Sequence, residues 1–235
     1  MMKKLIVLAA MIIAGIHVFG QTVKEEEKDV KHEWRLRLRG LAVIPQEESS
    51  IGVIGGDAEI STSIIPELDF TYFFNRHFAA ELILGTTRHK VNTTGSDLSA
   101  IGLGNSAEVD LGKVWLLPPT LTLQYHYPVG KVNPYLGAGV NYTIFYSVDQ
   151  GPIVNNVKYK NKFAFAAQAG IDIDISKKVF LNIDVKKIFL NTTAMVDAGN
   201  LTPEDSPSLA PVLSNIEADV KIRPWLVGFG LGYKF

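Results

Sequence analysis

The stretch ELDFTYFFNRHFAAEL, residues 67–82, decides the fold because it alternates between two kinds of side chain. Leu68 and Phe70 fall on one face of an extended chain, and Glu67 and Asp69 fall on the other. In a soluble protein the apolar face would point into the core. Here the opposite face carries small and charged side chains suited to a narrow lumen, so we expect the apolar face to contact lipid.

The same period-two alternation begins at Trp34 and recurs along the chain. Each segment has about 11 to 20 residues, whereas a tilted strand needs about 9–11 to cross a bilayer and soluble strands average about 5–6. Strand length therefore favours a membrane barrel. The predicted strands are 34–44, 62–74, 78–90, 113–127, 134–147, 163–175, 179–191 and 216–235.

The connections between these strands alternate between long and short. Short turns on one side and long loops on the other are the plan of outer-membrane barrels. We therefore predict an all-β fold, an eight-stranded antiparallel transmembrane β-barrel with both termini on the periplasmic side. The predicted short turns are 75–77, 128–133 and 176–178, and the predicted long loops are 45–61, 91–112, 148–162 and 192–215.

The N-terminus has the layout of a secretory signal peptide. Met1-Met2-Lys3-Lys4 is cationic, an apolar run follows, and small residues precede Gln21. Residues 1–20 are thus predicted to be a signal peptide, 21–33 a flexible periplasmic segment, and 34–235 the barrel. Export with this fold predicts a location in the bacterial outer membrane.

Charge and composition exclude several classes of function. Without Lys3 and Lys4, 21 of the 23 basic residues remain against 24 acidic ones, so no nucleic-acid partner is expected. The absence of cysteine excludes disulfides and thiolate metal sites. The histidines are scattered and no nucleophile motif is present, so we predict no metal, no cofactor, no catalytic residue and no enzymatic activity.

Strand phase also divides the lumen by depth. Inward positions near the periplasmic turns carry ions, which must be paired or hydrated when enclosed. Positions farther out turn apolar. The predicted ion network comprises Arg35, Arg37, Arg39, Glu67, Asp69, Glu81, Asp172, Asp174, Asp184 and Lys186. The predicted apolar upper lumen comprises Leu41, Val43, Ile65, Ile83, Leu116, Ile188, Leu190, Ile222 and Leu226, with Val114, Phe145 and Val220.

Nearly the whole barrel resembles the OmpW family of outer-membrane proteins. The resembling motifs are Arg37-Leu38-Arg39-Gly40, PELDFTYF at 66–73, AAEL at 79–82, GKVWLLPPTLTLQYHY at 112–127, PYLGAGVNYT at 134–143 and the C-terminal segment 224–235. Loops 45–61 and 192–215 depart from the family pattern. The resemblance implies an eight-stranded barrel with a narrow apolar channel for small hydrophobic molecules. It also implies that the terminal Phe235 is recognised by barrel-assembly machinery.

These observations lead to a transport hypothesis with open alternatives. A small hydrophobic solute would enter the apolar upper lumen, meet the charged layer and leave sideways into the membrane lipids. Proline breaks at Pro118-Pro119 or Pro224 could open the wall, because proline removes a ladder donor. The alternatives are a structural, receptor or adhesin barrel with a packed lumen, and a membrane-embedded enzyme for which His89 is the histidine near an outer loop.

Overall fold

The computed structural model describes residues 33–51, 55–97, 99, 104, 107–151, 156–202, 204 and 207–235. The predicted signal peptide, and all of the predicted periplasmic segment except Glu33, lie outside these residues. The described strands are β1 (Glu33–Ile44), β2 (Glu48–Ile51), β3 (Asp57–Ile60), β4 (Ser63–Phe73), β5 (Phe78–Gly85), β6 (Thr87–Ser96), β7 (Ala107–Leu117), β8 (Thr120–His126), β9 (Val132–Gln150), β10 (Asn156–Tyr159), β11 (Lys162–Asp174), β12 (Val179–Ile188), β13 (Asn191–Asp197), β14 (Ile216–Lys221) and β15 (Trp225–Lys234).

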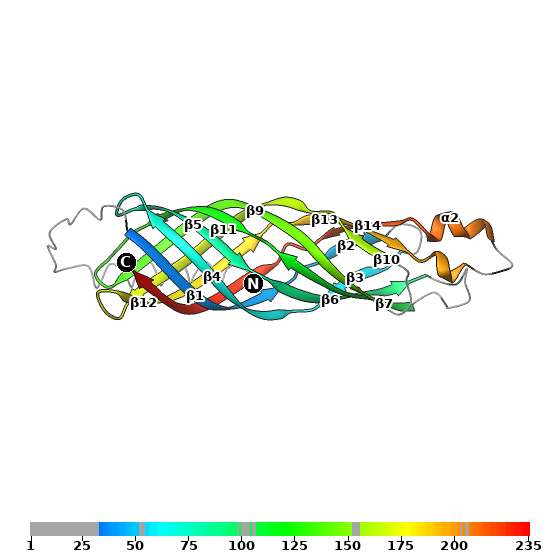
Figure 1. The fold of residues 1–235 in the computed structure, drawn as a ribbon, viewed down its shortest axis with the longest axis horizontal. Helices are drawn as coiled ribbons and strands as arrows, with labels where there is room; N and C mark the ends of the chain where they lie inside the picture. Colours follow the sequence, from blue (N-terminus) through cyan, green and yellow to red (C-terminus); the bar gives the residue numbers. More distant parts are fainter. Residues whose placement is uncertain are drawn as a thin grey trace, which may run out of the picture.

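Eight strands close into an antiparallel barrel in the order β1, β4, β5, β8, β9, β11, β12 and β15 (Figure 1). β15 pairs with β1, and β9 pairs with β11 from Lys162↔Thr143 to Ile173↔Val132. Closure matters because hydrocarbon offers no hydrogen bonds to an unpaired backbone group. The predicted fold class is confirmed.

The two faces of the wall are also as predicted. Outside, Phe70 is 39% exposed and Leu121 is 52% exposed. Inside, Asp69 and Asp172 are both 0% exposed. Apolar side chains therefore form the outer belt and ionic side chains are enclosed. At the short-turn end of this belt the rings of Trp34 and Tyr72 lie 4.7 Å apart, as expected of an aromatic interfacial girdle.

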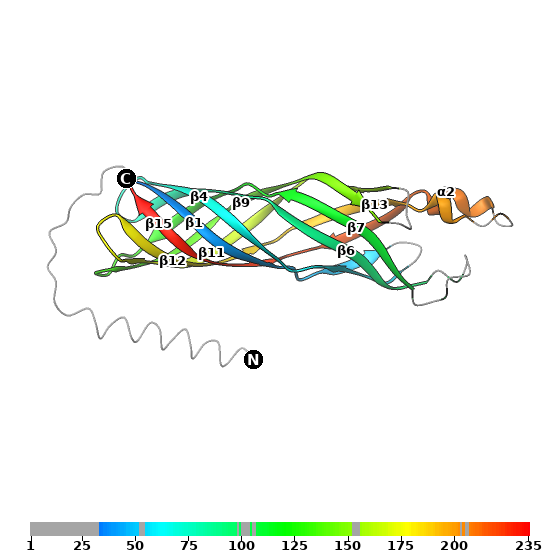
Figure 2. The same ribbon diagram turned by 60° about the horizontal axis from the view of Figure 1, so that its bottom comes forward.

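Beyond the belt, the barrel continues as strands instead of the predicted long loops (Figure 2). β3, β6, β7 and the outer part of β9 pair on one side, and β10, β13, β14 and β2 form a second sheet. The prediction of loops is therefore wrong over parts of 45–61, 91–112 and 148–162 and at the start of 192–215, where β13 extends to Asp197, whereas the described remainder of 192–215 is a long connection as predicted. Pairing overrides the turn-like composition there, helped by glycines at positive φ such as Gly95 (68°) and Gly112 (94°).

Several predicted strands are split where they leave the belt. Predicted strand 78–90 is interrupted at Thr86. Predicted strand 113–127 is interrupted at Pro118-Pro119, because proline has no N–H for the ladder. Strand 179–191 is interrupted at 189–190. Strand 216–235 is interrupted at 222–224, where Arg223 adopts a left-handed φ of 34°.

Among the described residues, the helical elements that span several residues lie in one outer connection. They are the 3-10 turns η2 (Gly199–Leu201) and η3 (Pro207–Leu209) and the short helix α2 (Ala210–Leu213). In the described part of the chain, no helix has the length and hydropathy needed to cross a membrane.

The wall predicts one specific packing constraint. Gly232 faces Phe180 in the β12–β15 register, and a Cβ at Gly232 would overlap the Phe180 ring. We expect Gly232→Val to destabilise the barrel by about 1–3 kcal/mol through overpacking. The measurement is the urea concentration at which half of the protein in micelles has unfolded, read from the gel band that shifts when the folded barrel is heated. The control is Gly40→Val, because the nearest atom to a Cβ at Gly40 is 3.9 Å away. Partial recovery is expected in Gly232→Val/Phe180→Leu, and equal midpoints for both single variants would contradict the constraint.

Candidate functional site

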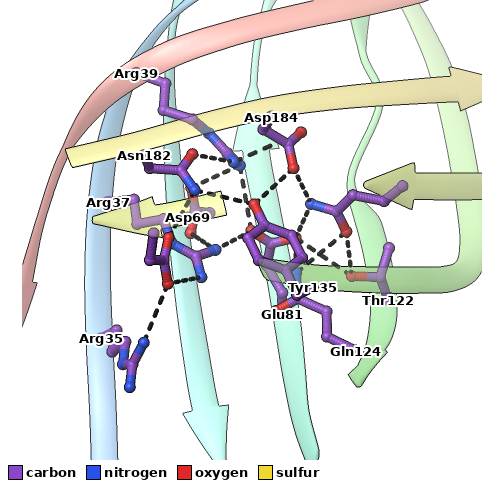
Figure 3. Close-up of polar contacts among 12 residues, drawn as sticks. Arg35, Arg37, Arg39, Asp69, Glu81, Thr122, Gln124, Tyr135, Asn182 and Asp184 are labelled. Carbon is purple, nitrogen blue, oxygen red and sulfur yellow. Dashed lines mark hydrogen bonds and ion pairs between the residues drawn. The ribbon is translucent and has the colours of Figure 1, made fainter. Parts of the chain in front are cut away.

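Arginines from β1 project into the barrel and meet carboxylates from the neighbouring strands (Figure 3). Arg37 Nη1 lies 2.5 Å from Glu81 Oε1 and 3.2 Å from Asp69 Oδ1. Arg39 Nη2 lies 2.7 Å from Asp69 Oδ2. Asp69 comes from β4 and Glu81 from β5, so these ion pairs tie three adjacent strands together across the lumen.

The opposite wall completes the network. Lys186 Nζ on β12 lies 2.7 Å from Asp184 Oδ1 and 3.1 Å from Glu67 Oε1. Arg35 Nη1 lies 3.1 Å from Asp172 Oδ2 on β11. Buried ions are tolerable only when paired and hydrogen-bonded, and each of these has a partner. We use the term ion network for Arg35, Arg37, Arg39, Glu67, Asp69, Glu81, Asp172, Asp184 and Lys186.

Neutral side chains donate further hydrogen bonds to two of these carboxylates. Gln168 Nε2 donates to Glu81 Oε2 at 2.7 Å and to Asp184 Oδ2 at 2.8 Å, and the hydroxyl of Tyr135 donates to Asp184 Oδ2 at 2.7 Å. Sequence reasoning missed these neutral members as parts of the site. The signal was available, since Gln168 shares its inward phase with Asp172 on β11.

Asp174 does not belong to this network, contrary to the prediction. Its Oδ1 lies 2.7 Å from Lys234 Nζ, and the side chain is only half-buried. The reason is depth, because Asp174 is the last residue of β11 and lies at the short-turn rim. The alternation along β11 predicted correctly that Asp174 faces inward, but it did not predict the distance of Asp174 from that rim.

Aromatic rings cover the ion network on the short-turn side. Phe73 and Phe180 are 1% and 0% exposed, and the guanidinium carbon of Arg35 lies 3.9 Å from the centre of the Phe73 ring. Ions and rings together fill the lower lumen. A straight path for a solute through the barrel is therefore obstructed by side chains.

Above the ion network lies an apolar cavity with a volume of about 130 Å³. Leu41 and Ile83 line its lower part and are 2% and 3% exposed. The structure places all nine residues of the predicted apolar upper lumen around it, together with the three further positions. These lining residues are Leu41, Val43, Ile65, Ile83, Leu116, Ile188, Leu190, Ile222 and Leu226, with Val114, Phe145 and Val220.

The cavity also reaches into the outer sheets. Ile51 on β2 and Val109 on β7 lie in segments predicted to be loops, and Ile216 on β14 is the first residue of a predicted strand; all three line the cavity and pack in one hydrophobic cluster. β2 has only four residues and β7 follows a segment with glycine and serine, so neither was recognised as a strand in the sequence. The signal for Val109 is the alternation of Val109 and Leu111 with Glu108 and Asp110.

The barrel wall is interrupted beside this cavity. β4 pairs with β5 only as far as Glu67↔Gly85, since Pro66 has no N–H to extend the ladder. Among the described residues, no register pair joins Ile64 or Ile65 to β6, whose pairing with β3 begins at Val91↔Ile60. Sequence reasoning overlooked Pro66, although a proline inside an alternating strand is the signal for such a break.

The other side of the same segment also lacks register pairs among the described residues, although Thr86 Oγ1 donates a hydrogen bond to Leu116 O across it at 3.1 Å. β5 pairs with β8 up to Ile83↔Thr120, and β6 pairs with β7 from Thr87↔Leu116. The residues between these pairs, 84–86 and 117–119, include the predicted break at Pro118-Pro119. We use the term wall break for residues 64–66, 84–86 and 117–119, of which Ile65, Gly85 and Pro118 line the cavity.

The second predicted opening, at Pro224, is absent because hydrogen bonds hold the wall there. Ile188 N–H donates to Pro224 O at 3.2 Å, and Ile222 N–H donates to Leu190 O at 2.9 Å. On the other side, Gln46 N–H donates to Ile222 O at 2.9 Å. The expectation of a gap at Pro224 is therefore wrong, since the carbonyl of a proline still accepts.

The ion network predicts a large effect on stability. Arg37→Met would leave Asp69, Glu81 and Asp172 short of a cation in a dry lumen, so we expect a loss of about 3–5 kcal/mol in the free energy of unfolding in micelles. The control is Arg88→Met, which removes an exposed pair with Asp149 and should change that free energy by about 0–1 kcal/mol. Equal small losses in both variants would rule out a structural role for the network.

Comparison with known proteins places this geometry in a family. The OmpW family profile matches residues 36–235. The uncharacterized outer-membrane protein y4mB of Sinorhizobium fredii is 42% identical over 204 residues, covering 86% of this chain and 80% of that protein. The dibenzothiophene metabolism operon protein PahQ of Pseudomonas aeruginosa is 31% identical over 188 residues, covering 78% and 77%.

A solved structure agrees with the sequence matches. The outer membrane protein OprG from Pseudomonas aeruginosa superposes with a TM-score of 0.72 at 26% identity, covering 87% of this chain and 96% of that chain. These relatives are outer-membrane barrel proteins, so the outer membrane is the location of this chain as well. The chain belongs to the OmpW family of outer-membrane β-barrels.

Proposed function

We propose that this barrel passes small apolar molecules from outside the cell into the outer membrane. The observation that carries the proposal is the apolar cavity above the ion network. Its volume of about 130 Å³ is close to the roughly 150 Å³ of engineered apolar cavities that bind benzene. A solute that enters it leaves water and gains about 25 cal/mol for each Å² of apolar surface buried.

The route of exit follows from what surrounds the cavity. Downward, the paired ions and the rings of Phe73 and Phe180 obstruct passage into the periplasm. Sideways, the wall break offers a stretch of wall with few ladder bonds to part. Ile65 lines the cavity there, while the neighbouring Ile64 is 83% exposed on the outer surface. We therefore place the exit between β4 and the β5–β6 junction, with the membrane lipids as acceptor.

One relative supports an apolar cargo. The name of the Pseudomonas aeruginosa relative refers to metabolism of dibenzothiophene, an apolar aromatic compound. The proposed role requires binding and release of the solute and no covalent chemistry, so catalysis is not part of it. His89 fits this proposal, because its Nδ1 shares a 2.6 Å hydrogen bond with Ser61 O and its Nε2 lies 3.0 Å from Thr87 Oγ1.

A structural or adhesin barrel with a packed lumen is the main competing function. The cavity volume favours passage, because close-packed protein interiors leave few voids larger than a water molecule. For assembly, we keep the proposal that the terminal Phe235 is the residue recognised by barrel-assembly machinery. Its side chain is 72% exposed at the short-turn end and accessible to such a partner.

A charge in the cavity should abolish passage. Leu116→Asp and Leu190→Asp each place a carboxylate among apolar side chains, where a solute cannot satisfy it. We expect the initial rate of toluene uptake by intact bacteria to fall about tenfold at equal barrel levels, which corresponds to about 1.4 kcal/mol. Leu116→Met conserves volume and apolarity and should keep the rate within about twofold. Unchanged uptake in both Asp variants would exclude the cavity as the route.

Filling the wall break should slow passage of the solute. A Cβ at Gly85 would meet Ile65 Cδ1 and Pro66 O at 3.8 Å, so Gly85→Leu covers the break with little strain. We expect toluene uptake to fall about tenfold, and toluene binding to the purified barrel to weaken as well, because the added side chain also occupies part of the cavity that Gly85 lines. Gly40→Leu adds the same side chain at an exposed position on β1 and should change neither. Normal uptake by Gly85→Leu would rule out exit at this place.

A further inference from the structure

Two aromatic rings stack at the outer end of the cavity. The centroids of Phe145 on β9 and Tyr159 on β10 lie 5.2 Å apart with an interplanar angle of 19°. Both residues line the cavity, whose other described lining side chains are mostly aliphatic, with His89 as the remaining ring. The cavity therefore has one place where a flat aromatic ligand could stack.

Backbone bonds fix the positions of both rings. Tyr159 pairs with Ala194 in the β10–β13 register. Phe145 N–H donates to Asn161 Oδ1 at 2.9 Å, which ties β9 to the segment that follows Tyr159. The stacked pair is thus built into two sheets and does not sit on a loose loop.

The hydroxyl of Tyr159 lacks a hydrogen bond within the described chain. Its ring packs against the hydrophobic cluster of the outer sheets, and burial raises the pKa of the hydroxyl above its ordinary value. Tyr159 is half-buried, so a ligand that covers its ring would take the hydroxyl out of water and would have to offer it a hydrogen bond in return.

The other polar groups of the cavity lining are already engaged. Thr143 Oγ1 donates to Asn141 Oδ1 at 2.7 Å, and Thr192 Oγ1 donates to Lys160 O at 2.8 Å. A bridging water at Tyr159 would need two to four polar partners, whereas the side chains packed on its ring are apolar. The Tyr159 hydroxyl thus has its donor and its acceptor capacity open to a ligand, whereas the hydroxyl protons of these threonines are already used.

We propose that the cargo is a small aromatic molecule with one hydrogen-bonding substituent, such as a phenol, and that Tyr159 and Phe145 form its binding site. The ligand ring packs against the aromatic pair, and its substituent exchanges a hydrogen bond with the Tyr159 hydroxyl. Because Tyr159 lies in the outer sheets, the polar end of the ligand faces outward and the apolar end points toward Leu41 and Ile83. This inference rests on the proposed function and names its substrate class.

The test compares two ligands of the same framework, p-cresol and toluene, on the purified full-length barrel in nanodiscs. The measured quantity is the ratio of the Kd for p-cresol to the Kd for toluene. Each ligand partitions into lipid to the same extent with every variant, so this contribution cancels when the ratio of a variant is compared with that of the wild type. In Tyr159→Phe we expect p-cresol to lose about twofold to tenfold in affinity while toluene binding is unchanged, as loss of one neutral hydrogen bond implies. The control is Tyr142→Phe, whose ring packs at a tilt against the exposed Phe163, and it should leave both affinities unchanged.

A second variant tests the stacking partner. Phe145→Leu keeps the site apolar, so we expect weaker binding of toluene relative to methylcyclohexane, again compared as a ratio with the wild type. An unchanged p-cresol to toluene ratio in Tyr159→Phe would overturn the role of the hydroxyl, and its satisfaction by solvent would then be the explanation. If none of the three ligands binds the wild-type barrel, the proposed function itself fails, which is a different outcome.

Discussion

Hydrocarbon cannot hydrogen-bond, and this constraint governs the rest of the structure. The backbone must satisfy itself through a closed ladder, so the sheet rolls up until β1 meets β15 and β9 meets β11. Closure leaves one enclosed face, and charged side chains such as Asp69 and Arg37 can lie only there. Once enclosed they must pair, and the pairing sets where the lumen is filled and where it stays open.

The ion network and the cavity are therefore two consequences of one arrangement. Where inward positions are ionic, side chains from opposite walls reach across and fill the lumen, as Lys186 does toward Glu67. Where they are aliphatic, shorter side chains such as Leu41 and Val43 leave free volume. The floor of the cavity is thus a layer of paired charge, and the ladder of the surrounding wall is interrupted near Pro66 and Pro118-Pro119.

The barrel and the side chains around its cavity could be predicted because both depend on period-two alternation alone. Leu116 and Ile188 are inward by parity whatever the tertiary context, and the structure places both on the cavity. The depth of a residue in the barrel and the pairing of its strand do not follow from alternation. Asp174 has the right parity but lies at the rim, and Ile51 and Val109 belong to strands that form only because partner strands are adjacent. The stacking of Phe145 on Tyr159 brings separate strands together, which no local pattern encodes.

The connectivity of the ion network has a consequence for assembly. Arg35 and Asp172 are 137 positions apart, and Lys186 and Glu67 are 119 apart, so these bonds exist only after the first and last strands have met. A half-zipped sheet can already pair Arg37 and Arg39 with Asp69 on the adjacent β4, but the carboxylates of Asp172 and Glu67 would still lack Arg35 and Lys186 from the far wall. Partly rolled intermediates therefore gain only the ion pairs between neighbouring strands, and the pairs that cross the lumen form together with the seam.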